Sequence, residues 1–381
     1  MDELCGASPE QTYLKKTSYT ARCARASRYL GGVSGETTTA HRRPRKIPDP
    51  VGQQCRSTLR DVDVPHYFRE RHVRSGYRPL YRDWRYYSLS LFHWHNETLN
   101  VWTHLLGALL VLLRFAQLAQ TVDFAGDAHA WPLLILLLSS LSYMSFSAVA
   151  HLFGGRSELC HYAFFFLDYV GVALYQYGSA VVHFYYVPRE DWHWHRPWWL
   201  RRAFLPVAAL LCCFSCFGCC YRKYSQHSQL ERAHKLGQVV PCAVAYAWDS
   251  SPVFHRLWGC LPLCDGDAAA LFHAGQVAFF LASAFFFTLP VPERWLAAPH
   301  RLLGLGHELF HTLLVLCTLC QIQGSHLDYL GRRALYLHLH GDGDAASFVV
   351  LFVAVAISCM LIVIVMMQKM KQLLNSRHKL L

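Results

Sequence analysis

From about Leu99 onward, the chain carries repeated apolar segments long enough to cross a lipid bilayer. A hydrocarbon core about 30 Å thick needs about 20 residues of α-helix, and a helix satisfies its own backbone polar groups there. We expect eight spans, near residues 99–120, 131–153, 161–187, 204–221, 236–254, 270–289, 305–322 and 346–367. Pro241 and Asp249 interrupt the fifth. The pattern predicts an all-α polytopic membrane protein with its transmembrane part at residues 99–367.

Charge supports a lipid environment. Only 16% of the residues are charged, below the roughly 25% usual in soluble domains. The formal net charge of +11 would suit nucleic acid, but basic charge on a membrane protein more often records topology. We therefore expect the bilayer, and no nucleic acid, as a partner.

The distribution of Lys and Arg predicts the orientation. The segment before the first span holds 17 of them, and the loops and tail on the same side hold 11 more. The opposite side holds 7, and Arg114 lies inside the first span. Because basic residues accumulate on the cytosolic side, both termini are expected in the cytosol, which requires an even number of spans.

Three segments flank the spans. Residues 1–63 are expected to form a disordered cytosolic tail, since the first 60 are rich in Arg, Thr, Ser and Gly. Residues 64–98 form a juxtamembrane segment, and residues 368–381 a basic cytosolic tail. Residues 1–95 contain no apolar run long enough for a signal-peptide core.

Two clusters near the fourth span have structural explanations. Trp192, Trp194, Trp198 and Trp199 are expected at the outer membrane boundary, where amphipathic rings settle. His193 and His195 lie among them, and metal binding there is the less favoured alternative. Small residues within the span favour close helix packing over a metal cluster. They are Cys212, Cys213, Ser215, Cys216 and Gly218.

Ionisable side chains inside hydrocarbon are costly, so each one indicates a function or a partner. Ser147 and His151 are four residues apart near the cytosolic end of the second span. His307 and His311 show the same spacing at the start of the seventh span, and residues four apart share a helix face. Asp168 lies one or two turns into the third span. The topology places all five residues in one layer.

This layer predicts a zinc site. Three neutral imidazoles, from His151, His307 and His311, with a fourth position left open are typical of catalytic Zn²⁺. Asp168 is then placed to orient or deprotonate a water on the metal, and Ser147 to support the metal's surroundings or a substrate oxyanion. Interhelical hydrogen bonding of the histidines is the alternative.

Other polar residues are candidate ligand contacts. Tyr175, Gln176 and Tyr177 make one flank of the third span polar, and His183 lies near its outer end. The three residues of the flank are expected either to bond a ligand carbonyl or to form interhelical hydrogen bonds. For His183, the alternative to ligand contact is pairing with another residue or contact with solvent. His104 in the first span is expected to pack.

Three segments resemble the progestin and adipoQ receptor family. They are GYRPLYRDWRYYSLSLFHWHNETLNVWTHLLG at 76–107, SFSAVAHLFGGRSELCHYAFFFLDYVGVALYQYGSA at 145–180 and GHELFHTLLVLCTL at 306–319. The motifs LDYVGVALYQYGSA, VPERW and LDYLGRR are most similar to the progestin branch of the family, with a lean to its alpha subtype. The resemblance implies a bundle of seven core transmembrane helices plus an eighth C-terminal transmembrane helix.

The resemblance also implies a plasma-membrane receptor for a steroid such as progesterone or a related progestin. It implies rapid non-genomic signalling, with an inhibitory G protein as a partner. In the adiponectin receptors of the family, the zinc histidines correspond here to His151, His307 and His311, and the water-orienting aspartate to Asp168. One departure is Glu308, where progestin-type members usually carry Gln.

Two functional hypotheses stay open. The first is a steroid receptor whose ligand shifts a helix-packing equilibrium. The second is a zinc-dependent amidase acting on a membrane lipid such as a ceramide, alone or gated by a steroid. The same histidines also fit a purely structural metal clamp. An ordinary G-protein-coupled receptor with an outside N-terminus is disfavoured by the 17 basic residues before the first span.

Overall fold

The computed structural model describes residues 58–70, 72–189, 192, 197–225, 231–260, 266–289, 291–292, 305–340 and 345–380. Within these ranges the chain forms 11 α-helices and three short 3-10 helices, so the all-α expectation is confirmed. The expected tail at 1–63 lies almost wholly outside the described residues.

The first half of the chain forms α3 (Trp84–Ser90), α4 (Thr98–Leu118), α5 (Trp131–Phe153), α6 (Glu158–Tyr185) and α8 (Trp198–Ser225). The second half forms α9 (Glu231–Asp249), α10 (Ser251–Cys260), α11 (Ala268–Thr288), α12 (Leu305–Gly331), α13 (Arg333–His340) and α14 (Ala345–Leu380). Each of the eight expected spans coincides with a helix. The fifth is divided between α9 and α10 just after Asp249.

Six helices within the described part of the chain are long and apolar enough to cross a membrane, namely α4, α5, α8, α11, α12 and α14. The chain is therefore a polytopic membrane protein. The expected third and fifth spans, α6 and α9, are not among the six. Polar residues explain this, because α6 carries Asp168, Gln176 and His183, and α9 begins with Glu231 and Arg232.

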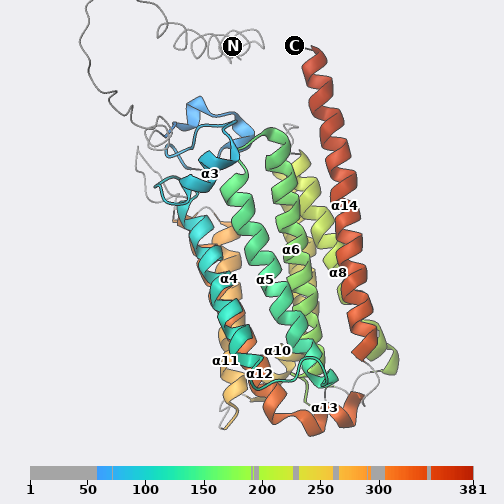
Figure 1. The fold of residues 1–381 in the computed structure, drawn as a ribbon. Helices are drawn as coiled ribbons and strands as arrows, with labels where there is room; N and C mark the ends of the chain where they lie inside the picture. The colour runs from blue at the N-terminus through green and yellow to red at the C-terminus, as the bar shows by residue number, and fades with distance from the viewer. Residues whose placement is uncertain are drawn as a thin grey trace, which may run out of the picture. The chain divides into compact units, whose positions relative to one another are not determined.

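Neighbouring helices pack along one another as α5 with α6, α11 with α12, and α4 with both α5 and α12. α8 packs against α6, α9 and α14. Figure 1 shows α3 at one end of the bundle and α13 at the other, with the C-terminal end of α14 at the α3 end. The last turn of α5 and the first turns of α6 and α12 meet at the α3 end.

Small residues bring α5 and α6 together. A Cβ added at Gly171 would lie 2.6 Å from the Cα of Tyr143, and one added at Gly178 would overlap Ser139. The two glycines are seven residues apart, so they share one face of α6. Such contacts replace the hydrophobic driving force that lipid does not supply.

Arg78 anchors the juxtamembrane segment to the bundle. Its guanidinium donates to the backbone carbonyls of His151 (2.7 Å) and Leu152 (2.8 Å) and to the hydroxyl of Ser90 (2.8 Å). The last carbonyls of a helix have no partner within it, so Arg78 caps the end of α5. This contact fixes the position from which the His151 side chain projects.

Replacing Arg78 by Ala is expected to lower the free energy of unfolding by about 3 kcal/mol, because buried carbonyls lose their donor. Denaturation of the purified chain in detergent micelles measures the change. The matched control is Arg85→Ala, an exposed position in α3. Equal stability of the two variants would contradict the capping role.

Candidate metal centre

Three histidines meet at the α3 end of the bundle. His151, near the end of α5, lies beside His307 and His311, which are one turn apart at the start of α12. One ring nitrogen from each lies within 4.8 Å of the others. Three nitrogens around a single Zn²⁺ at about 2.0–2.1 Å would be roughly 3.4 Å apart. Small side-chain rotations therefore suffice for the triad to hold a metal ion.

The surroundings of the histidine rings are suited to metal binding. The Nδ1–H of His151 donates to Oε2 of Glu97 at 2.7 Å, which leaves Nε2 of the same ring for a metal. The backbone of Asn100 in α4 lies beside His311. The Nδ1 of His311 is buried and has no partner among the described residues. Metal-binding histidines usually donate their other N–H to a carboxylate or a backbone carbonyl, so the donor set fits zinc.

A fourth imidazole lies against the triad. His104 of α4 stacks on His311 with ring centres 3.8 Å apart and planes 9° apart. Both nitrogens of His104 are buried without a partner in the described part of the chain. From the sequence, His104 is expected only to pack, and Glu97 has no predicted role. The spacing of Glu97, Asn100 and His104, three and then four residues, signals one shared face of α4.

Carboxyl groups surround the triad on the juxtamembrane side. The carboxyl groups of Glu70 and Glu97 lie close together. Burial, together with the negative charge of Glu97, raises the pKa of Glu70 well above its usual value. Glu308, the residue that departs from the progestin-type pattern, is buried and lies close enough to act on Glu70 as well. The surplus of acidic groups favours a cation in the triad.

Asp168 and Ser147 lie beside the triad rather than in it. Ser147 lies close to the Asp168 carboxylate and interacts with it. Among the described residues, the group of possible ligands contains only the three histidines. Asp168 interacts electrostatically with His151, so the pair lies in the surroundings of the centre.

The candidate ligand contacts of α6 have protein partners in most cases. The hydroxyl of Tyr175 donates to Gln321 of α12 at 2.7 Å, and that of Tyr177 donates to the backbone carbonyl of Phe348 in α14 at 3.2 Å. His183 bonds the backbone carbonyl of Asp249 at 2.9 Å. The Oε1 of Gln176 is buried and lacks a partner within the described residues.

A buried polar network continues from this flank to the α13 end. Nε2 of His183 accepts from the amides of Gln276 (3.1 Å) and Gln321 (3.0 Å). Gln276 also donates to His273, whose Nε2–H donates to Asp328 at 2.8 Å. Arg256 completes the network, since its guanidinium makes two bonds to Asp328 and further bonds to Asp267. Sequence spacing gave no sign of this network, because its members lie on four different helices.

The chain is similar to known proteins over most of its length. The profile of the haemolysin-III related family matches residues 92–322. The membrane progestin receptor alpha-B of Danio rerio is 52% identical over 74% of this chain and 79% of its own length. The membrane progestin receptor alpha of Homo sapiens is 49% identical over 76% of this chain and 80% of its own length. The membrane progestin receptor beta of Homo sapiens is 45% identical over 80% of this chain and 84% of its own length.

The family profile extends from just before α4 into α12, so it includes the three histidines, Asp168 and the polar flank of α6. The chain belongs to the haemolysin-III related family, the progestin and adipoQ receptors, in the branch of the membrane progestin receptors.

Proposed function

We propose that the chain is a plasma-membrane receptor for progestins that signals rapidly, through an inhibitory G protein. The observation that carries the proposal is the likeness to membrane progestin receptors over about three quarters of the chain. The steroid, an apolar molecule, enters from the bilayer and binds between aromatic-rich helices.

The proposed arrangement in the membrane has eight spans, with both termini in the cytosol. α6 and α9 join the six apolar helices, and α14 is the eighth span outside a core of seven. The packing of α6 between α5, α8 and α14 supports its place in the bundle. The position of α3 and the end of α14 at the same end of the bundle supports the even count (Figure 1). The tail at 1–63, the juxtamembrane segment at 64–98 and the tail at 368–381 are cytosolic.

The polar flank of α6 is the proposed steroid contact. Gln176 offers an unpartnered amide oxygen, so its side chain has hydrogen-bonding capacity left for a ligand. Tyr175 already bonds α12, Tyr177 bonds α14, and His183 bonds α9. A ligand that bonds these groups must replace interhelical bonds, and this exchange changes the relative stability of two helix packings. Such a shift is the signal that a receptor transmits.

We also propose that the centre holds zinc through His151, His307 and His311. When bound, zinc would supply Lewis-acid activation of a water or a carbonyl. Among the chain's own groups, Glu97 fixes the tautomer of His151. Ser147 orients Asp168, and Asp168 is the group that accepts or returns a proton.

The Ser147–Asp168 pair beside the triad favours a second candidate function, hydrolysis of an amide bond in a membrane lipid such as a ceramide. A purely structural metal clamp would need no proton acceptor. Steroid binding and hydrolysis are compatible in one chain, because the polar flank and the centre occupy different depths of the bundle.

Glu97→Gln is expected to weaken zinc binding about 10-fold to 100-fold, the usual effect of losing a hydrogen-bond partner of a ligand. Competition with a chromophoric chelator on purified protein measures the affinity. Asp123→Asn, in the loop after α4, is the control and should leave the affinity unchanged. A His307→Ala, His311→Ala variant that kept one equivalent of zinc would refute the triad as the site.

Gln176→Leu is expected to weaken saturable binding of tritiated progesterone about 10-fold, since one hydrogen bond is worth about 1.4 kcal/mol. Gln120→Leu, an exposed position after α4, should bind normally. Absence of saturable binding to the unaltered chain would refute the receptor proposal. Unchanged affinity of Gln176→Leu would place the steroid elsewhere.

If the His307→Ala, His311→Ala variant bound progesterone normally and lost lipid hydrolysis, the steroid and metal sites would be separate.

An epitope tag at the N-terminus is expected to stay unlabelled on intact cells and to become labelled after permeabilisation, because the basic N-terminal segment is retained in the cytosol. Flow cytometry with and without detergent measures this. A tag in the loop between α4 and α5 is the control and should be labelled on intact cells. Labelling of the N-terminal tag on intact cells would contradict the proposed orientation.

A further inference from the structure

A cavity of about 500 Å³ lies where four helix ends meet. The last residues of α6 and α13 and the first turns of α8 and α14 line it. Since α13 lies at the end opposite α3, the cavity is far from the histidine triad (Figure 1). It is separate from both the metal centre and the polar flank of α6.

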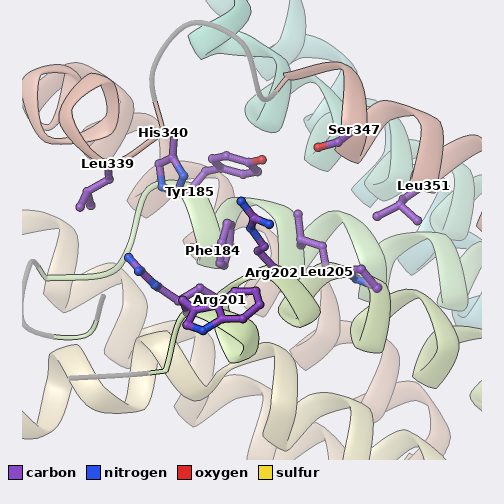
Figure 2. Close-up of a pocket in the computed structure, with 11 residues that line it drawn as sticks. Phe184, Tyr185, Arg201, Arg202, Leu205, Leu339, His340, Ser347 and Leu351 are labelled. Carbon is purple, nitrogen blue, oxygen red and sulfur yellow. The ribbon is translucent and has the colours of Figure 1, made fainter. Parts of the chain in front are cut away.

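Two arginines give the cavity its chemistry. Arg201 and Arg202 extend from α8 toward the side where Tyr185 and His340 lie (Figure 2). In the described ranges of the chain, neither forms an ion pair with a carboxylate. Nε of Arg201 is buried and has no hydrogen-bond partner there. A buried guanidinium nitrogen without an acceptor costs free energy, so the site is incomplete without an anion.

The backbone adds to the positive potential. Arg201 is in the first turn of α8 and Ser347 in the first turn of α14, so two helix N-termini converge on the cavity. Each N-terminus carries a partial positive charge and unpaired N–H groups, which favour phosphate-like anions. Arg202 also lies over the ring of Trp198, 5.6 Å from its centre, which holds the guanidinium at the cavity.

The other end of the cavity is apolar. Leu205 and Pro206 lie one turn further along α8, and Leu351 one turn beyond Ser347 on α14. Trp198 is 64% exposed and Trp199 is 56% exposed, as expected of rings in the interfacial belt. The arginines therefore lie at the membrane boundary, and the leucines lie within the hydrocarbon. A ligand that fits both ends carries an anionic headgroup and an apolar tail.

We propose that this cavity binds the phosphate headgroup of an anionic glycerophospholipid, with an acyl chain between α8 and α14. Arg201 and Arg202 hold the phosphate, and Leu205 and Leu351 contact the chain. A neutral steroid would leave both guanidinium charges without a counterion. The lipid bridges α14 to α8, so it strengthens the attachment of the C-terminal helix to the bundle.

The test uses the full chain purified in a neutral detergent and titrated with dioctanoyl phosphatidate, with the thermal unfolding midpoint as the readout. The lipid is expected to raise the midpoint of the unaltered protein. The double variant Arg201→Gln, Arg202→Gln is expected to bind about 100-fold more weakly, since each charge-assisted hydrogen bond is worth about 10-fold. The matched control is Arg333→Gln, a half-exposed arginine that pairs with Asp127 at the same end.

Two further ligands test whether the site requires an anionic headgroup and whether it requires a lipid rather than free phosphate. Dioctanoyl phosphatidylcholine, which has no net charge, is expected to bind at least 10-fold more weakly than the phosphatidate. Inorganic phosphate at equal concentration is expected to leave the midpoint unchanged. An equal shift with inorganic phosphate would make this a free-phosphate site and overturn the lipid proposal.

A third variant keeps the test decisive if the double variant fails to fold. Leu351→Trp fills the apolar end and leaves both arginines in place, so it is expected to weaken phosphatidate binding at least 10-fold. Unchanged affinity in Leu351→Trp, or in the double variant, would overturn the proposal.

Discussion

The polar side chains that α12 buries determine how the other helices pack around it. They recur at intervals of three, four or seven residues, so they form a stripe along one face. Four of them have partners on other helices, and such partners matter because an unpartnered polar group in hydrocarbon costs several kcal/mol. His311 contacts His104 of α4, Thr318 bonds Tyr143 of α5, Gln321 bonds His183 of α6, and Asp328 bonds Arg256 of α10 and His273 of α11. Through these contacts, α12 holds five other helices in register.

This stripe also connects the proposed steroid contact to the proposed zinc centre. Tyr175 accepts a hydrogen bond from Thr318, and Tyr143 bonds the same hydroxyl. The ring of Tyr143 lies edge-on against His104 (5.7 Å), which stacks on His311. A ligand that displaced Tyr175 would thus disturb a continuous series of contacts ending at the triad. This continuity gives ligand-gated chemistry a physical route through two hydrogen bonds and two ring contacts.

The sequence predicted the helices well because a membrane imposes their minimum length. All eight expected spans are helical, and the i, i+4 spacing of His307 and His311 placed both on the face that meets His151. Helix ends were predicted less well, since α12 continues to Gly331 and α14 to Leu380. Hydropathy identifies the apolar part of a helix, and a helix continues past it wherever water or other side chains solvate its polar residues.

Partners across helices could not be predicted, because periodicity gives the face of a residue and not the helix opposite. Glu97 illustrates this limit, since a carboxylate just before the first span is expected in water and instead bonds His151. Tyr175, Tyr177 and His183 were open between ligand contact and interhelical bonds, and the packing gives each an interhelical partner. Arg201 and Arg202 counted in the sequence only as charges on the outer side.

The attachment of α14 follows from the same physics. Lipid tails are as apolar as a helix surface, so apolar burial alone does not hold a helix against a bundle. Cys216 of α8 and Cys359 of α14 are buried small residues that permit close approach, and Tyr177 of α6 donates to the backbone of α14 at Phe348. The hydrogen bond is at the α13 end, beside the cavity that Arg201 lines. A lipid phosphate held there would act on the end of α14 where the polar contact already lies, so the helix would be fixed at that end and freer to move at its C-terminal end.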